Sequence, residues 1–399
     1  LLSLLSGMPI IESLLSYYGP GVASFVSSYI ILFICSAIFG KIYEDTGMAM
    51  SIAKGICSRV GTSSLGVILA VYFVTCLLVY GGISLFCVVF AVFPIALAIF
   101  KEANVSRHII PACIFGGLGT WAATFSPGNP QNLQIIACNA LGTTPMSEAG
   151  LGFILVVFMI ALHVLIFWWY DRRCKKKNIT FENDPEIAGI TEKFEGRALP
   201  NFWLSLLPMI TVVVLLNLVS LDIIICLIAG IAVGMLVGWK YYDGKKINAA
   251  NVGASNAVSA LLNTAVVIGF GSLVQVTPAF EVVKTAILGM EGSPVLSFAL
   301  ATTLLAGACA SGTGGMAISL QTLAPSYLAM GVPAGVLQRI ALTASCTLDS
   351  LPHNGALYSC FSVCKSDHRH AYFLTMLLSV VATTLTMIVG VVIASVWYV

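Results

Sequence analysis

The stretch SCTLDSLPHNGALYSC, residues 345–360, places a carboxylate, an imidazole, an amide and two helix breakers between two apolar runs. Such polar groups are rare elsewhere in the chain: 58% of its 399 residues are hydrophobic and 9% are charged. A soluble domain carries about 25% charged residues, because a fold in water needs a polar surface. The composition therefore predicts an all-α polytopic membrane protein, with residues 345–360 interrupting a helix at membrane depth.

A series of apolar segments supports this class, since about 20 apolar residues span a bilayer. Gly, Pro and polar residues interrupt several of them, which a membrane tolerates only where protein or a water-filled cavity covers the backbone. The chain begins LLSLLSG without Met, so we expect that an N-terminal membrane segment is missing. The segments are 22–40, 64–79, 84–100, 108–124, 150–170, 202–220, 222–239, 256–276, 294–310, 315–330, 335–349 and 371–397.

One long polar loop, residues 171–197, separates two halves of the chain and begins with the basic run DRRCKKK. Basic loops of membrane proteins stay on the cytoplasmic side. The basic segments KYYDGKK (240–246) and KSDHRH (365–370) are placed on that side by the same rule. We therefore expect a first repeat over residues 1–170, a cytoplasmic linker over 171–200 and a second repeat over 201–399.

The two halves show the same order of features with opposite charge bias. Ser126-Pro127 and Leu351-Pro352 fall at matching points, and a glycine-rich turn precedes each of them. KEANVSRH (101–108) is basic, whereas its counterpart MGVPAGV (330–336) carries no charge. This pattern predicts inverted-topology repeats, each with a re-entrant hairpin and a broken transmembrane helix. Such repeats are typical of secondary transporters, whose substrate site lies near the bilayer midplane.

Four polar breaks are the candidate substrate site. The ends of half-helices there expose unpaired N–H groups and a partial positive charge, which bind carboxylates. We expect the amides of Asn129, Asn132 and Asn354 to bond substrate hydroxyls. The alternative is that the breaks are kinks packed by small residues, as is common in transmembrane helices. The candidate residues are Gly81, Gly82, Ser84, Ser126, Gly128, Asn129, Asn132, Ser311, Gly312, Thr313, Gly314, Ser350, Asn354 and Gly355.

Asp349 and His353 are the candidates for proton coupling. An ionisable residue at membrane depth is a functional hypothesis by default, and both groups can be tuned to exchange protons near neutral pH. The alternative is that Asp349 caps a half-helix and His353 donates to backbone carbonyls. Away from the breaks, we expect His163 to be structural, Asp222 to lie in a loop and Arg339 to reach the outer surface.

The quoted residues resemble the gluconate permease family of the ion transporter superfamily. The resemblance rests on FGKIYEDTGMAMSIAKGI (39–56), the GGIS turn (81–84), the Pro-Gly break before NLQ, and DSLPHNGALYS (349–359). It covers essentially the whole chain. It implies a homodimer in the bacterial cytoplasmic (inner) membrane, with a scaffold domain, a mobile transport domain and elevator-type movement. It also implies uptake of small organic anions with protons. Sodium-coupled relatives in the superfamily carry Ser-Asn-Thr motifs at both tips, and this chain lacks them.

The sequence therefore predicts a proton symporter of gluconate-type or hydroxycarboxylate anions, with no enzyme activity, no cofactor, no metal and no nucleic-acid partner. The expected partners are the anion and the lipid bilayer. No Lys or Arg is expected at a break, so helix ends must carry the anion binding. The alternatives are a sodium-coupled carboxylate symporter, an intramembrane enzyme using Asp349 and His353 as an acid–base pair, and a passive channel.

Overall fold

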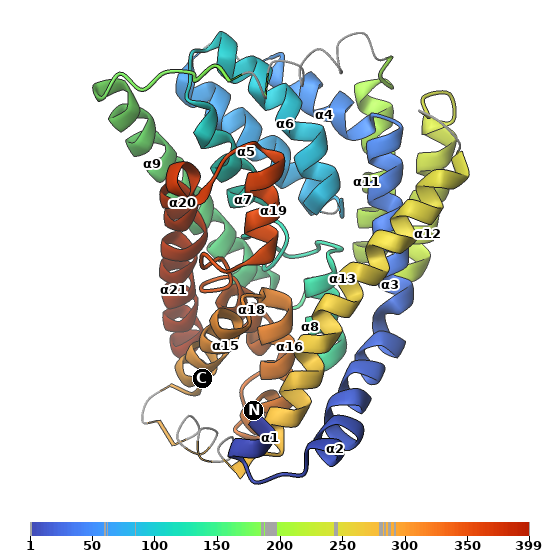
Figure 1. Cartoon of the computed structure of the whole chain (residues 1–399), viewed down its shortest axis with the longest axis vertical. Coiled ribbons are helices and arrows are strands. Elements are labelled where there is room, and N and C mark those ends of the chain that lie inside the picture. The colour runs from blue at the N-terminus through green and yellow to red at the C-terminus, as the bar shows by residue number, and fades with distance from the viewer. Residues whose placement is uncertain are drawn as a thin grey trace.

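A computed structural model describes residues 2–398 except 60, 62, 84, 185–186, 188–197, 243–245, 279–281, 283–284, 286–288 and 291–292. Every regular element in these ranges is a helix, as predicted (Figure 1). Four of the helices are long and apolar enough to cross a membrane: Ile10–Asp45, Ala149–Lys176, Asn251–Gln275 and His368–Trp397.

One group of helices surrounds a closely packed pair. The pair is α3 (Gly19–Asp45) and α13 (Lys246–Gln275), and it packs beside α11 (Phe202–Asn217) and α12 (Ile223–Gly238). A methyl group built on Gly21 would lie 3.1 Å from the Cα of Gly269, so the two backbones meet with almost nothing between them. The short helices of this group are α1 (Leu2–Leu5), α2 (Ile10–Glu12) and α4 (Met48–Cys57).

The remaining helices follow the order hairpin, interrupted helix, long helix, and they follow it twice. The first copy is the hairpin α5 (Ser64–Tyr80) and α6 (Leu85–Glu102), the crossing α7 (Ile110–Leu118) and α8 (Asn132–Leu141), and α9 (Ala149–Lys176). The second is the hairpin α15 (Pro294–Cys309) and α16 (Gly312–Thr322), α17 (Ala324–Ala329), the crossing α18 (Ala334–Ser345) and α19 (Gly355–Val363), then α20 (His368–Met376) and α21 (Ala382–Trp397).

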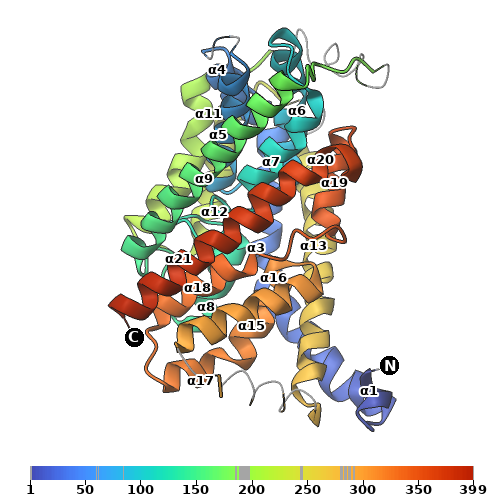
Figure 2. The same ribbon diagram turned by 90° about the vertical axis from the view of Figure 1, so that its left-hand side faces the viewer.

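The long helices that close the two copies run in opposite directions. At one face of the molecule Arg107 joins Asp184, which follows α9, to Lys365, which precedes α20. At the opposite face Glu148, just before α9, is hydrogen-bonded to Tyr398, just after α21. Figure 2 shows α9 and α21 side by side.

The two hairpins enter from these opposite faces. The loop after α6 lies at the linker face, where the Phe181 amide donates to Asn104. The residue before α15 lies at the other face, where Ser293 is hydrogen-bonded to Ser395 near the end of α21. Both hairpin tips therefore point toward the middle of the molecule.

Three predicted spans are shorter in the structure. The segment 108–124 is helical only to Leu118, and the segment 335–349 only to Ser345. Pro127 and Pro352 follow these ends and have no amide hydrogen with which to continue a helix. The segment 315–330 is divided into α16 and α17, and α17 has Pro325 in its first turn.

The outer surface is apolar, as a bilayer requires. Trp203, Leu218 and Leu236 on α11 and α12 are among the most exposed large side chains in the described part of the chain. The end of α9 instead has a mixed aromatic and cationic character, because Arg172 stacks 4.0 Å over the ring of Trp168 and Arg173 lies 5.5 Å over that of Trp169. Trp beside Arg is typical of a membrane–water interface.

Candidate functional site

The tip of the first hairpin packs on the break between α7 and α8. Gln131 Nε2 donates to the carbonyl oxygens of Val79 (2.6 Å) and Ile83 (3.3 Å). The Tyr80 hydroxyl donates to the Pro127 carbonyl at 3.0 Å. Gly82 has φ +92°, and a Cβ there would lie 3.1 Å from Pro130, so the tip needs glycine.

The amide of Asn129 is used within this first break. Its Nδ2 donates to the carbonyl oxygens of Thr124 (3.0 Å) and Ser126 (2.7 Å), and its Oδ1 accepts from the Gln131 amide (3.1 Å). The side chain is fully buried. The loop thus takes up both Nδ2 hydrogens, whereas Oδ1 keeps a second acceptor position, so the contact of Asn129 with substrate hydroxyls stays a prediction.

Two contacts join the first break to the surrounding helices α3 and α11. Asn132 Oδ1 accepts from the Ser36 hydroxyl at 3.0 Å. Asn217 Nδ2 donates to the Gly128 carbonyl at 2.8 Å. Gly128 has φ +80°, and a Cβ on it would lie 3.1 Å from Asn217 Oδ1.

The tip of the second hairpin packs on the break between α18 and α19 through Asp349. The Gly312 backbone amide, at the start of α16, is a hydrogen-bond partner of the Asp349 carboxylate. The Ser350 hydroxyl donates to the same carboxylate at 2.7 Å. Ser311 caps α16 by accepting from the Gly314 amide at 3.1 Å. A carboxylate thus lies at the N-terminus of a half-helix, where a negative charge is favoured.

Asn354 and His353 complete this second break. Asn354 Oδ1 accepts from the Leu357 amide at 2.7 Å, and its Nδ2 donates to the carbonyls of Asp349 (2.8 Å) and Ala310 (3.1 Å). As in Asn129, both Nδ2 hydrogens are bound within the break and Oδ1 keeps a second acceptor position, so the contact of Asn354 with substrate stays a prediction. His353 Nε2 donates to the Gly307 carbonyl at 3.1 Å.

The two breaks meet in the interior, where Thr124 Oγ1 lies 3.5 Å from Cys346 Sγ. Each tip thus contacts the break of its own repeat, and the breaks contact each other. The other predicted residues lie around this centre. Ser126 and Ser350 are buried, and Thr313 is half-buried. Gly81 faces Met209 and Gly314 faces Val267, whereas a Cβ on Gly355 would meet nothing within 4 Å. Ser84 lies outside the described residues.

Arg339 is the residue that the sequence analysis misjudged. Its side chain is fully buried rather than at the outer surface. The guanidinium donates to the backbone carbonyls of Phe125 (3.2 Å), Ser147 (2.8 Å) and Pro145. The sequence analysis expected no Lys or Arg at a break, but Arg339 lies beside the first one. It belongs to none of the ion pairs in the described part of the chain.

His163 and Asp222 lie where they were expected. His163 Nε2 donates to the Leu378 carbonyl at 3.0 Å, and its Nδ1 is 2.7 Å from the Tyr72 hydroxyl, so both ring nitrogens have partners. Asp222 precedes α12 and accepts from the Ile224 amide at 2.8 Å.

The fold has counterparts among solved structures. The chain is similar in structure to the YdaH transporter of Alcanivorax borkumensis, with a TM-score of 0.61 and 14% identity over 94% of this chain and 87% of that one. It is also similar to MtrF of Neisseria gonorrhoeae, with a TM-score of 0.58 and 12% identity over 98% of this chain and 84% of that one. The helices, the apolar surface and these likenesses define the all-helical fold of a multi-pass membrane protein.

The sequence comparisons give the family. Residues 1–226 match the GntP family permeases. The uncharacterized transporter YxjC of Bacillus subtilis is 31% identical over 88% of this chain and 83% of its own length. An uncharacterized transporter of Haemophilus influenzae is 24% identical over 85% of this chain and 78% of its own length. The chain belongs to the GntP permease family and is a transporter, not an enzyme.

Proposed function

We propose that this permease takes up a small organic anion of the gluconate or hydroxycarboxylate type together with a proton. The observation that carries the proposal is the position of Asp349 at the N-terminus of α16, in contact with the Gly312 amide. A helix end of this kind attracts a carboxylate. An internal carboxylate already occupies it, so a substrate carboxylate must compete with Asp349 for the same donors.

Protonation of Asp349 resolves this competition. A neutral carboxyl group is held less strongly by the helix end than a carboxylate, so it can leave the Gly312 amide to the substrate. Proton and anion would then bind together and be released together. For a monocarboxylate the pair carries no net charge across the membrane. His353, which donates to Gly307, would hold the tip of the second hairpin in place during this exchange.

Arg339 supports an anion at this depth. Glu148 acts electrostatically on the Arg339 guanidinium from the loop before α9, but among the described hydrogen bonds this guanidinium binds backbone carbonyls and no carboxylate. Its field would favour an anion at the first break, next to Phe125, without direct contact. This cation supplements the helix ends on which the anion site was expected to depend alone.

The movement would be of the elevator type, with inverted-topology repeats over residues 1–170 and 201–399 and a cytoplasmic linker over 171–200. The two re-entrant hairpins, the broken helices, α9 and α20–α21 would form the transport domain. The group around α3 and α13 would form the scaffold of a homodimer in the bacterial inner membrane. The contacts of Asn132 with Ser36 and of Gly128 with Asn217 would then have to break in each cycle.

The test is uptake and counterflow in proteoliposomes, with gluconate, 3-hydroxybutyrate and citrate and with proton and sodium gradients imposed separately. We expect an inward proton gradient to drive uptake by the wild type. Asp349→Asn should keep counterflow, but its gradient-driven uptake rate should fall at least about tenfold, because the asparagine side chain carries no titratable proton. Ser350→Ala, which keeps the carboxylate, should retain the response to the gradient.

Sodium coupling is the alternative, and the same experiment decides it. Uptake that ignores pH and follows sodium would overturn the role of Asp349. It would direct attention to the backbone oxygens of the two breaks. Asn129 and Asn354 already donate to several of these oxygens, which favours the proton.

A further inference from the structure

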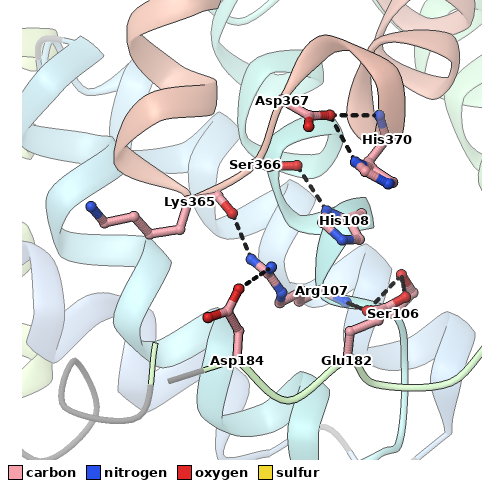
Figure 3. Close-up of polar contacts among 9 residues, drawn as sticks. All are labelled: Ser106, Arg107, His108, Glu182, Asp184, Lys365, Ser366, Asp367 and His370. Carbon is pink, nitrogen blue, oxygen red and sulfur yellow. Dashed lines mark hydrogen bonds and ion pairs between the residues drawn. The ribbon is translucent and has the colours of Figure 1, made fainter. Parts of the chain in front are cut away.

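A second polar cluster lies at the face of the molecule that carries the linker, away from the breaks (Figure 3). It brings together three segments that are distant in sequence: residues 104–108 before α7, linker residues 181–184, and residues 365–370 between α19 and α20. The Ser106 hydroxyl and the Arg107 amide both donate to Glu182, at 2.7 and 3.0 Å. The cluster therefore ties both repeats to the segment that connects them.

Arg107 lies at the centre of this cluster and is only 8% exposed. Its guanidinium donates to the Lys365 carbonyl at 2.6 Å and to Asp184 at 3.1 Å. One buried side chain thus bridges the second repeat and the linker. A guanidinium stays charged at all physiological pH values, so this bridge does not respond to protons.

Two histidine rings lie beside Arg107 in this cluster. The rings of His108 and His370 are stacked, with centroids 4.6 Å apart and planes 20° apart. His108 Nδ1 is hydrogen-bonded to the Ser366 hydroxyl at 2.9 Å, and His370 Nδ1 lies 2.8 Å from Asp367 Oδ1. A cavity of about 510 Å3 adjoins the rings, so water reaches this face of the cluster.

We propose that residues 104–108, 181–184 and 365–370 form a pH-sensitive clasp, which is closed at neutral pH and opens when His108 is protonated. Across the stack, His370 opposes a positive charge on His108. Protonated His108 would also face the Arg107 guanidinium on its own segment. Glu182 and Asp367 oppose this repulsion.

Burial supports the same direction. It lowers the pKa of His108 from its ordinary value of 6.5, and this effect outweighs the opposing influence of Glu182. An imidazole released into water regains its ordinary pKa, so the open form binds the proton more strongly than the closed form. Falling pH therefore favours opening, beginning near pH 6.5 and increasing below it.

The clasp is connected to the transport site by one short helix. α19 begins at Gly355 in the second break and ends at Val363, two positions before Lys365. The clasp thus fixes the far end of the half-helix that begins beside Asp349. If the proposed proton symport holds, opening would slow uptake as the cytoplasm acidifies, and so limit the acid load that uptake itself brings.

Hydrogen–deuterium exchange of the purified full chain in lipid nanodiscs tests the clasp without any substrate. We expect backbone exchange over residues 362–370 to be several-fold faster at pH 5.5 than at pH 7.5, after correction for the intrinsic rates. The increase should not exceed about tenfold, because a single proton that binds the open form with the ordinary pKa of 6.5 shifts the opening equilibrium by no more than that. His108→Gln should show the same exchange at both pH values. His368→Gln is the matched control: its ring lines the same cavity but packs against Phe361 and Tyr372, so the wild-type pH response should remain.

His108→Gln also removes the hydrogen bond between His108 and Ser366, so a second variant is needed that leaves this bond in place. His370→Gln leaves His108 in place and removes the other ring of the stack, so it should also reduce the pH response. A wild type with equal exchange at both pH values would overturn the clasp, and so would a full pH response in His108→Gln. Because exchange is measured without transport, this result does not depend on the proposed symport.

Discussion

At the scale of single residues, two glycines set the shape of the site. Gly82 and Gly128 both adopt left-handed backbone conformations, at a hairpin tip and at a helix break. Other residue types adopt this region at a cost of about 1–2 kcal/mol. Both also lie against neighbours that a side chain would displace. Glycine at these points is thus a requirement of both conformation and space.

Gly128→Ala should destabilise the protein by about 1–2 kcal/mol and impair transport, because the new methyl group would meet Asn217 and strain the backbone. The measurement is the thermal unfolding of the purified protein together with counterflow. Gly150→Ala is the control, since Gly150 lies in the first turn of α9 with open space around it. It should melt at the same temperature as the wild type or slightly higher. Equal melting of both variants would contradict this account of the break.

At the scale of elements, Arg339 shows how one side chain fastens three segments. It extends from α18 and donates to carbonyls before the first break and in the loop between α8 and α9. These residues are buried or half-buried. The Pro145 carbonyl also accepts from the Gly128 amide and from Gln134 Nε2, so removal of the guanidinium would take this donor away chiefly from the carbonyls of Phe125 and Ser147. This side chain of α18 therefore fastens the interrupted helix of the second repeat to that of the first repeat.

Arg339→Met should cost roughly 2 kcal/mol or more in stability, because the backbone acceptors of Phe125 and Ser147 are left unpaired at about 1 kcal/mol or more each. Arg339→Lys keeps the charge but cannot reproduce the planar fork, so its loss should be smaller yet clear. Thermal unfolding in detergent would rank the three proteins. A methionine variant as stable as the wild type would mean that desolvation of the guanidinium cancels what its hydrogen bonds contribute.

The elements were more predictable than the contacts between them. Apolar length and the positions of Pro127 and Pro352 are local signals, and they predicted the helices and both breaks. The role of Asn129 also has a local signal, because Asn often bonds backbone groups two or three residues away. The burial of Arg339 has none: its partners Phe125 and Ser147 are 214 and 192 positions away in sequence. Nothing near residue 339 distinguishes a buried arginine from one that extends to the surface.

At the scale of the whole molecule, the two copies of the repeated order run in opposite directions. The tips of the two hairpins enter from opposite faces, and α9 is antiparallel to α20–α21. A site between the tips can then be reached from either side by equivalent movements. The reversed charge bias read from the loops agrees with this arrangement.

Labelling with a membrane-impermeant maleimide would test the orientation. Lys177→Cys, at the end of α9, should react only from the cytoplasmic side, and Thr144→Cys, in the loop before α9, only from the outside. Both positions are exposed, whereas the native cysteines are buried or, for Cys309, half-buried. The unmodified protein is the control. Reaction of both variants from the same side would contradict the proposed topology.

The Trp and Arg side chains at the end of α9 bear on what the lipids must do. Trp168, Trp169, Arg172 and Arg173 favour the headgroup layer, and Arg173 also stacks on Phe373 of α20. A transport domain that carries this anchor cannot slide freely past the headgroups. Each stroke of an elevator would instead pull the nearby leaflet with it and curve the bilayer at the protein's edge. In such a cycle the elastic energy of the deformed bilayer would oppose each movement, so the thickness and stiffness of the membrane would contribute to the transport rate.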